Sequence, residues 1–212
     1  MADHLEIEQK FDADPGLERP DLAGVTAGVT AAAPVLHHLS ATYFDTADGR
    51  LQAAKITLRR RTGGTDAGWH LKLPAGGVPA PGEVATRREV QEPLESGGTD
   101  GAGAPVVPGG LASRVAEVTG GLPLAPIAIL RTERTVVTLT GDDGTRLAEI
   151  ADDQVTASRL PETSAEPLRW REIEVEVPTA APELQRAVAD RLLAAGARPA
   201  GHGSKLARLL SA

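Results

Sequence analysis

The chain has 212 residues, a formal net charge of -7 and no cysteine. The lack of cysteine excludes disulfides, thiolate nucleophiles and cysteine-ligated metal sites, and it suits a cytoplasmic location. Negative charge and only 2% aromatic residues argue against nucleic acid as a partner. No run approaches the ~18 apolar residues of a membrane-spanning helix, so we expect no membrane partner either.

Alternating hydrophobicity predicts five strands in the first half of the chain. They cover residues 4–11, 38–45, 56–62, 69–73 and 84–92. Prolines make 12–36 a loop with at most a short helix at 21–26, and 47–54 is a turn with one or two helical turns. The connections at 63–68 and 74–82 are rich in Gly and Pro, and the first is typical of a hairpin. Residues 96–110 are almost all small or Pro, which predicts a flexible loop inside one domain.

The second half predicts longer strands at 127–140, 145–157 and 168–177. Helices are expected at 111–119, at 182–195 where Pro182 begins the helix, and at 204–210. Eight strands with mostly hairpin-length connections favour a closed antiparallel barrel. The expected fold is therefore mainly β, an eight-stranded antiparallel β-barrel with a few covering helices, and one domain spans 1–212.

Charged residues fall on one face of each predicted strand, because alternate residues of a strand point to opposite sides. The other face is apolar, as at Leu58, Leu71 and Val175, and needs cover from helices and loops. We therefore expect the charged faces to line the inside of the barrel. Alternation predicts that Asp153 and not Asp152, and Arg87 and not Arg88, point into the barrel. The charged set is Glu6, Glu8, Lys10, Arg59, Arg61, His70, Lys72, Arg87, Glu89, Arg134, Glu149, Asp153, Glu172, Glu174 and Glu176.

Such crowding is poorly explained by stability, since burying one ion costs several kcal/mol and its partners often only offset that cost. Carboxylates on the first, seventh and eighth strands are oxygen ligands suited to Mg²⁺ or Mn²⁺. Arginine and lysine donate well to phosphate oxygens. The pattern thus predicts a water-filled tunnel that binds a chain of phosphates together with a divalent metal.

Nine motifs follow one another from residue 4 to about residue 210. They are Glu6-x-Glu8-x-Lys10, TYFDT at 42–46, LRRR at 58–61, LKLP at 71–74, RRE at 87–89, the strand of Arg134, AEIADD at 148–153, EIEVEV at 172–177 and SKLARLL at 204–210. In this order they resemble the CYTH domain, the triphosphate tunnel metalloenzyme superfamily. That superfamily includes class IV adenylyl cyclases, thiamine triphosphatases and inorganic triphosphatases.

The resemblance implies a tunnel that binds a triphosphate with Mg²⁺ or Mn²⁺ and cleaves a phosphoanhydride bond. The implied metal ligands are Glu6, Glu8, Asp153, Glu172 and Glu174. The implied phosphate-binding residues are Lys10, Arg59, Arg61, Lys72, Arg87, Arg134 and Lys205, with Lys205 on a segment that plugs or covers the tunnel mouth. The implied catalytic residues are Glu6, Glu8, Lys10, Arg59, Arg61 and Lys72.

Other residues have plainer interpretations. Glu89 and Glu149 are either metal ligands or partners that hold arginines in place. We expect Tyr43 and Trp69 to pack in the core, and Lys55, Arg60 and Arg88 to be exposed.

Three functions stay open on the sequence. The first is a metal-dependent triphosphatase, the second a cyclase that makes cyclic AMP from ATP, and the third a non-catalytic module that binds polyphosphate or nucleotides. Few aromatic side chains are available to stack on an adenine or thiamine ring, which favours inorganic triphosphate as the substrate. The sequence leaves the oligomeric state open, a homodimer included.

Overall fold

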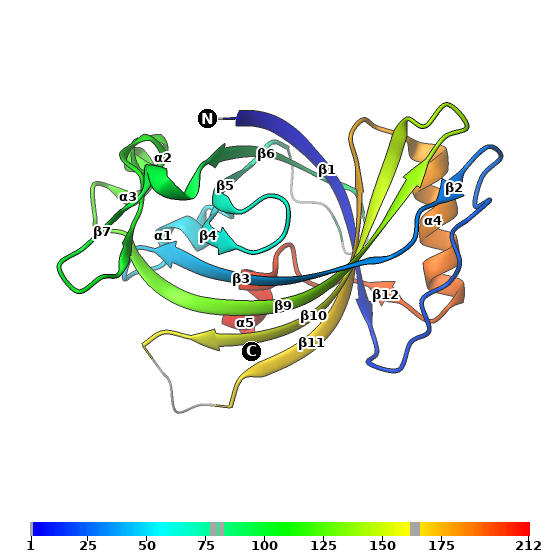
Figure 1. Cartoon of the computed structure of the whole chain (residues 1–212). Helices are drawn as coiled ribbons and strands as arrows, with labels where there is room; N and C mark the ends of the chain where they lie inside the picture. Colours follow the sequence, from blue (N-terminus) through cyan, green and yellow to red (C-terminus); the bar gives the residue numbers. More distant parts are fainter. Residues whose placement is uncertain (1, 77–79, 81–82, 162–165) are drawn as a thin grey trace.

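The computed structural model describes residues 2–76, 80, 83–161 and 166–212, and within them eight long strands close into a barrel (Figure 1). The strands are β1 (Ala2–Ala13), β3 (Val35–Asp45), β4 (Thr57–Thr62), β5 (Gly68–Pro74), β6 (Ala85–Glu92), β9 (Ala125–Thr140), β10 (Arg146–Arg159) and β11 (Leu168–Val177). Their order around the barrel is β1, β6, β5, β4, β3, β9, β10, β11 and back to β1, with every neighbouring pair antiparallel. This confirms the predicted fold class.

Short elements fill the connections. They are β2 (Thr30–Ala31), the 3₁₀ turn η1 (Leu94–Ser96), β7 (Gly98–Thr99), β8 (Pro105–Val106) and β12 (Arg198–Pro199). The stretch 96–110, predicted to be a flexible loop, contains the small antiparallel pair of β7 and β8. No helix forms at 21–26, where the backbone only turns. Residues 77–79 and 81–82 of the predicted loop 74–82 lie outside the described residues.

One group of helices covers the outer face of β4, β5 and β6. These are α1 (Arg50–Ala53), α2 (Gly109–Arg114) and α3 (Ala116–Thr119), so the helix predicted at 111–119 consists of two pieces. The buried carboxylate of Asp45 accepts hydrogen bonds from the backbone N–H groups of Leu51 and Gln52 and so anchors α1 to β3. The apolar cluster under these helices includes Leu51, Leu58, Trp69, Leu71, Val90, Leu111 and Val115.

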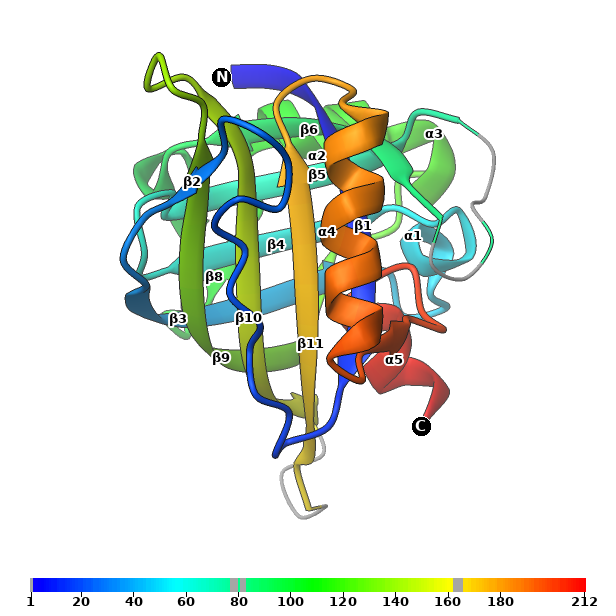
Figure 2. The same cartoon turned by 90° about the vertical axis from the view of Figure 1, so that its right-hand side faces the viewer.

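A longer helix, α4 (Pro182–Ala194), lies along the outside of β11 and β1 (Figure 2). It begins at Pro182, whose missing N–H costs nothing in the first turn. Its buried face packs on outward-pointing side chains of four strands. That cluster includes Phe11, Val137, Ile150, Ile173, Val175, Leu184, Val188 and Leu192.

The last helix, α5 (Lys205–Ser211), packs against the inner side of the barrel wall. Leu206 and Leu209 contact an apolar cluster made by inward-pointing residues of β3, β9, β10 and β11. That cluster is Ala41, Tyr43, Ala128, Leu130, Val155, Ala157 and Trp170. The interior is therefore apolar where α5 packs, and its remaining part is left to the charged residues.

The two faces of the strands are divided as predicted. Leu58, Leu71 and Val175 point outward and are fully buried under helices. The charged residues predicted to line the barrel, such as Arg59, Lys72 and Glu174 of the same strands, point inward. None of the helices in the described ranges is long and apolar enough to span a membrane.

Candidate functional site

The charged inner faces enclose a cavity of about 200 Å³. Its lining includes Glu6, Lys10, Arg59, Arg61, Lys72, Arg87, Glu89, Arg134, Glu174 and Lys205. A wider hollow of about 370 Å³ adjoins this cavity, shares Lys10 and Arg87 with it, and is lined by Glu8, α1 and residues 200–204. Every phosphate-binding residue implied by the resemblance thus lines the interior.

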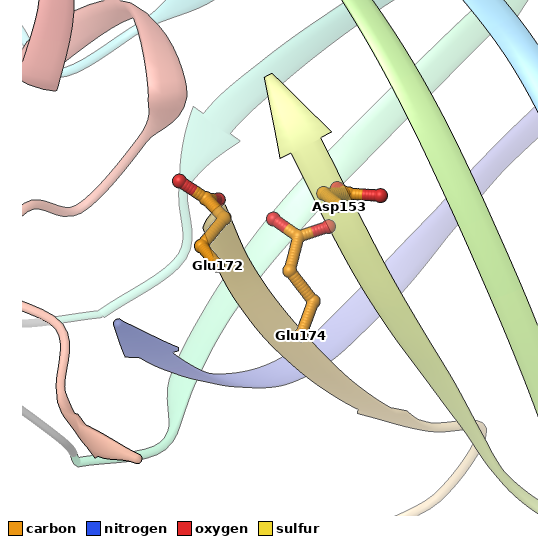
Figure 3. A group of neighbouring side chains, drawn as sticks. All are labelled: Asp153, Glu172 and Glu174. Carbon is orange, nitrogen blue, oxygen red and sulfur yellow. The ribbon is translucent and has the colours of Figure 1, made fainter. Parts of the chain in front are cut away.

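Three carboxylates form a compact group on β10 and β11 (Figure 3). Asp153 and Glu172 are direct partners across the two strands, and Glu174 is the next inward residue of β11. One oxygen from each residue lies within 4.8 Å of the other two. Asp153 has no exposed surface, so the group lies deep in the barrel wall. We call Asp153, Glu172 and Glu174 the acidic cluster.

Cations surround the acidic cluster. Arg134 donates from Nε and Nη2 to the two oxygens of Asp153 at 2.7 and 2.6 Å, and from Nη2 to Glu174 at 2.7 Å. The Nζ of Lys205 lies 2.8 Å from an oxygen of each carboxylate in the cluster. Burial alone would raise the pKa of Asp153, but Lys205 and Arg134 hold it below its ordinary value.

The acidic cluster fits a divalent cation. Its donors are hard carboxylate oxygens on two neighbouring strands, the ligand type that Mg²⁺ and Mn²⁺ prefer. Glu172 Oε1 is buried and forms no hydrogen bond of good geometry, but the ammonium of Lys205 lies 2.8 Å from it. A divalent ion could neutralise this oxygen in place of the ammonium.

A second group, Arg59 and Arg61 on β4, faces the cavity. The Nε atoms of both side chains are buried and have no hydrogen-bond partner. Arg61 pairs with Asp66, whereas Arg59 has no carboxylate within 4.0 Å among the described residues and meets only the hydroxyl of Tyr43, at 3.3 Å. Burial and the neighbouring Arg59 lower the pKa of Arg61 to about 9. Of these two cations, Arg59 lacks an anionic partner among the described residues.

Glu6 and Glu8 lie beside the acidic cluster but do not belong to it. Glu6 pairs with Lys72, and Glu8 pairs with Arg87 and, at 2.8 Å, with Lys10. Lys10 also pairs with Glu174 and so links the two regions. The cluster of three thus contains Asp153, Glu172 and Glu174 of the five implied metal ligands, and a metal role for Glu6 and Glu8 stays a prediction.

Glu8 gives a testable pH dependence. Burial would raise its pKa, but Lys10 and Arg87 outweigh burial and lower this pKa from 4.5 to about 2. The ionised carboxylate then stabilises the fold above pH 4.5, and this stabilisation is lost as the pH falls towards 2. We expect Glu8→Gln to lower the free energy of unfolding of the metal-free protein by about 3 kcal/mol at pH 7 and by less at pH 3. Urea denaturation in EDTA measures both values, and an equal loss at both would contradict the interpretation.

Several contacts of residues in the site were not predicted. Tyr43 was expected only to pack, yet its hydroxyl meets Arg59 in the cavity. Trp170 donates its indole N–H to Glu172, with which it shares an inward face of β11. His70 is buried, with Nδ1 2.8 Å from Glu89 and Nε2 3.0 Å from the carbonyl oxygen of Asp66. Strand alternation places Trp170 and His70 inward, but nothing local indicates which partner each meets.

Asp152, Arg88 and Trp69 lie on the strand faces that alternation predicts for them. Asp152 points away from the cluster and accepts two hydrogen bonds of 2.9 Å from Arg171, and the exposed Arg88 pairs with Asp3. Trp69 packs in the core as expected. Glu89, however, bonds to His70 and lies 3.9 Å from Lys72, and Glu149 lies 3.3 Å from Arg146. Within the described part of the chain, Glu149 pairs with an arginine and Glu89 does not.

The fold and the site together define a charged barrel for anions and metal ions. The sequence matches the CYTH domain family over residues 4–208, so the chain belongs to this family, as its motifs indicated. CYTH proteins include triphosphatases and cyclases, bind triphosphate substrates and depend on divalent metals.

Two proteins of Mycobacterium tuberculosis, from strains CDC 1551 and H37Rv and both uncharacterised, are 41% identical to this chain over 223 residues. The alignment covers all of this chain but only 41% of each relative. Among solved structures, a presumed adenylate cyclase of Bacillus halodurans has a TM-score of 0.60 and 18% identity, with 98% of each chain covered. A presumed adenylyl cyclase of Hippeastrum, with a dominant triphosphatase activity, has a TM-score of 0.59 and 20% identity over 97% of this chain and 95% of that one. At these identities the two structures support the fold alone.

Proposed function

We propose that this chain is a divalent-metal-dependent triphosphatase that hydrolyses a phosphoanhydride bond, with inorganic triphosphate as its favoured substrate. One observation carries the proposal: the acidic cluster, which is fit for a metal ion, reaches through Glu174 the same cavity that is lined by Arg59, a cation without a carboxylate partner among the described residues. A metal-bound triphosphate supplies both missing partners at once.

The side chains of the barrel suit this reaction. Arg59, Arg61 and Lys72 point into the cavity, where they would donate to the phosphate oxygens and stabilise the charge that develops on them. The surrounding wall limits access of bulk water, which strengthens each of these interactions. A divalent ion held by Asp153, Glu172 and Glu174 would supply further Lewis-acid stabilisation of the phosphate chain.

The hollow beside the cavity supports a second candidate. At about 370 Å³ it has room for an organic group attached to the triphosphate, such as the nucleoside of ATP in a cyclase reaction. Its described lining contains no Phe, Trp or Tyr, and His202 is its one ring-bearing side chain apart from proline. A base would therefore find little to stack on, so we rank inorganic triphosphate first.

A substrate panel tests the proposal. We expect phosphate release from inorganic triphosphate with Mg²⁺ or Mn²⁺, at least about tenfold slower release from ATP and thiamine triphosphate, and none in EDTA. The assay would measure phosphate and cyclic AMP in parallel. Cyclic AMP from ATP would favour the cyclase, and tight triphosphate binding without turnover would favour a binding module.

A further inference from the structure

Lys205 occupies the centre of the acidic cluster. Its Nζ lies 2.8 Å from Asp153 Oδ2, Glu172 Oε1 and Glu174 Oε1. The residue is 8% exposed, so water competes little for these contacts. One ammonium group thus stands at the point on which all three carboxylates converge.

The position of Lys205 is fixed by α5. Ser204 caps the helix by accepting a hydrogen bond from the Ala207 N–H at 3.1 Å. Leu206 and Leu209 pack into the apolar cluster inside the barrel. Arg208 pairs with Asp12 of β1 and stacks on Trp170 at 5.1 Å from the ring centroid. The ammonium group therefore comes with a docked helix, and its displacement strains those contacts.

A lysine and a metal ion cannot share this place. Mg²⁺ binds carboxylate oxygens at about 2.1 Å, so two ligands of one ion are at most about 4.2 Å apart. In the metal-free structure one oxygen of each carboxylate lies 2.8 Å from Nζ, the contact length of an ammonium and longer than that of Mg²⁺. An ion at the centre would lie within contact distance of Nζ, and the two positive charges would repel strongly in a buried site.

We propose that Lys205 is the built-in cation of the metal-free site, so that a divalent ion binds only when Lys205 leaves and α5 loosens. This inference rests on the metal site of the proposed function. Lys205 also lines the cavity, so the released ammonium is within reach of a bound phosphate chain. Metal entry thereby frees a phosphate-binding residue.

Thermodynamic linkage relates the free energy of metal binding to the free energy with which Lys205 is held in the cluster. If Lys205 weakens metal binding by some factor, metal must weaken the anchoring of Lys205 by the same factor. We expect about tenfold, within the usual range for coupled sites. The coupling has two independent readouts, metal affinity and the exposure of α5.

Calorimetric titration with Mn²⁺ in the absence of any phosphate compound tests the first readout. Lys205→Met keeps most of the length of the side chain and removes its charge, and it should bind Mn²⁺ about tenfold more tightly than wild type. Lys55→Met, which removes an exposed lysine at the mouth, is the matched control and should bind like wild type. Equal or weaker binding by Lys205→Met would overturn the inference while leaving the metal site intact. No binding by any variant would refute the metal site itself.

Amide hydrogen exchange of wild type tests the second readout and needs no substitution. Mg²⁺ should accelerate exchange in the peptide 204–212, the reverse of the slowing that ligands usually cause. Peptides from β10 and β11 should slow in the same experiment because they carry the ligands. Unchanged or slower exchange at 204–212, with slowing at β10, would show that metal binds without displacing the helix and would overturn the inference.

Discussion

Replacing Asp153 by asparagine is expected to abolish Mn²⁺ binding and to lower triphosphate hydrolysis by at least about a thousandfold. Asp153 is the one member of the acidic cluster with no exposed surface, and an amide offers a metal ion neither its charge nor its second anionic oxygen. The substitution also removes one carboxylate partner of Arg134 and one of Lys205. Phosphate release and calorimetric titration on the purified variant measure the two effects.

The neighbouring residue supplies the control. Asp152→Asn changes the same chemistry one position earlier, but Asp152 faces away from the cavity and binds Arg171. It should lower the melting temperature while the folded protein keeps its Mn²⁺ affinity and its rate. If Asp153→Asn still bound Mn²⁺, the acidic cluster would not be the metal site. If both variants lost Mn²⁺ affinity and hydrolysis rate equally, the cause would be a general effect on folding.

Alternation along single strands made most of the fold and much of the site predictable. A strand repeats every two residues, so Leu58 and Arg59 must point to opposite sides, and only one side can be covered by helices. The same rule separates Asp153 from Asp152 and Arg87 from Arg88, because a shift of one residue moves a side chain through the sheet. Eight strands with short connections form one antiparallel sheet, and closing that sheet into a barrel is the simplest way to remove its free edges.

Contacts between distant segments were not predictable in this way. Parity places Glu6, Glu8 and Glu174 on inner faces but says nothing of their depth along the barrel axis, which follows from strand register and tilt. Lys205 reaches the acidic cluster because α5 packs through Leu206 and Leu209, and no local pattern encodes where a seven-residue helix docks. The pairing of Asp66 with Arg61 likewise depends on the shape of a Gly-rich hairpin.

The arginine pair leads to the second large effect. We expect Arg59→Gln to lower kcat/KM for triphosphate by about 100- to 1,000-fold, the usual cost of removing one preorganised donor to a developing oxyanion. The Mn²⁺ affinity should not change, because Arg59 contacts no member of the acidic cluster among the described residues. Parallel kinetics and metal titration separate this loss from that of Asp153→Asn.

Stability should change much less than activity. Burial would lower the pKa of the half-buried Arg59, but Tyr43 and Glu89 outweigh burial and raise it, so the fold favours this charge. The same charge helps to lower the pKa of Arg61. Because these two effects oppose each other, metal-free Arg59→Gln should unfold at a melting temperature close to that of wild type. Arg60→Gln, on the outer face of the same strand, is the matched control and should leave both kcat/KM and melting temperature nearly unchanged. If folded Arg59→Gln hydrolysed triphosphate at the wild-type rate, the phosphate chain would bind elsewhere in the barrel and not to β4. If the variant lost activity only because it unfolded, the role of Arg59 would be structural.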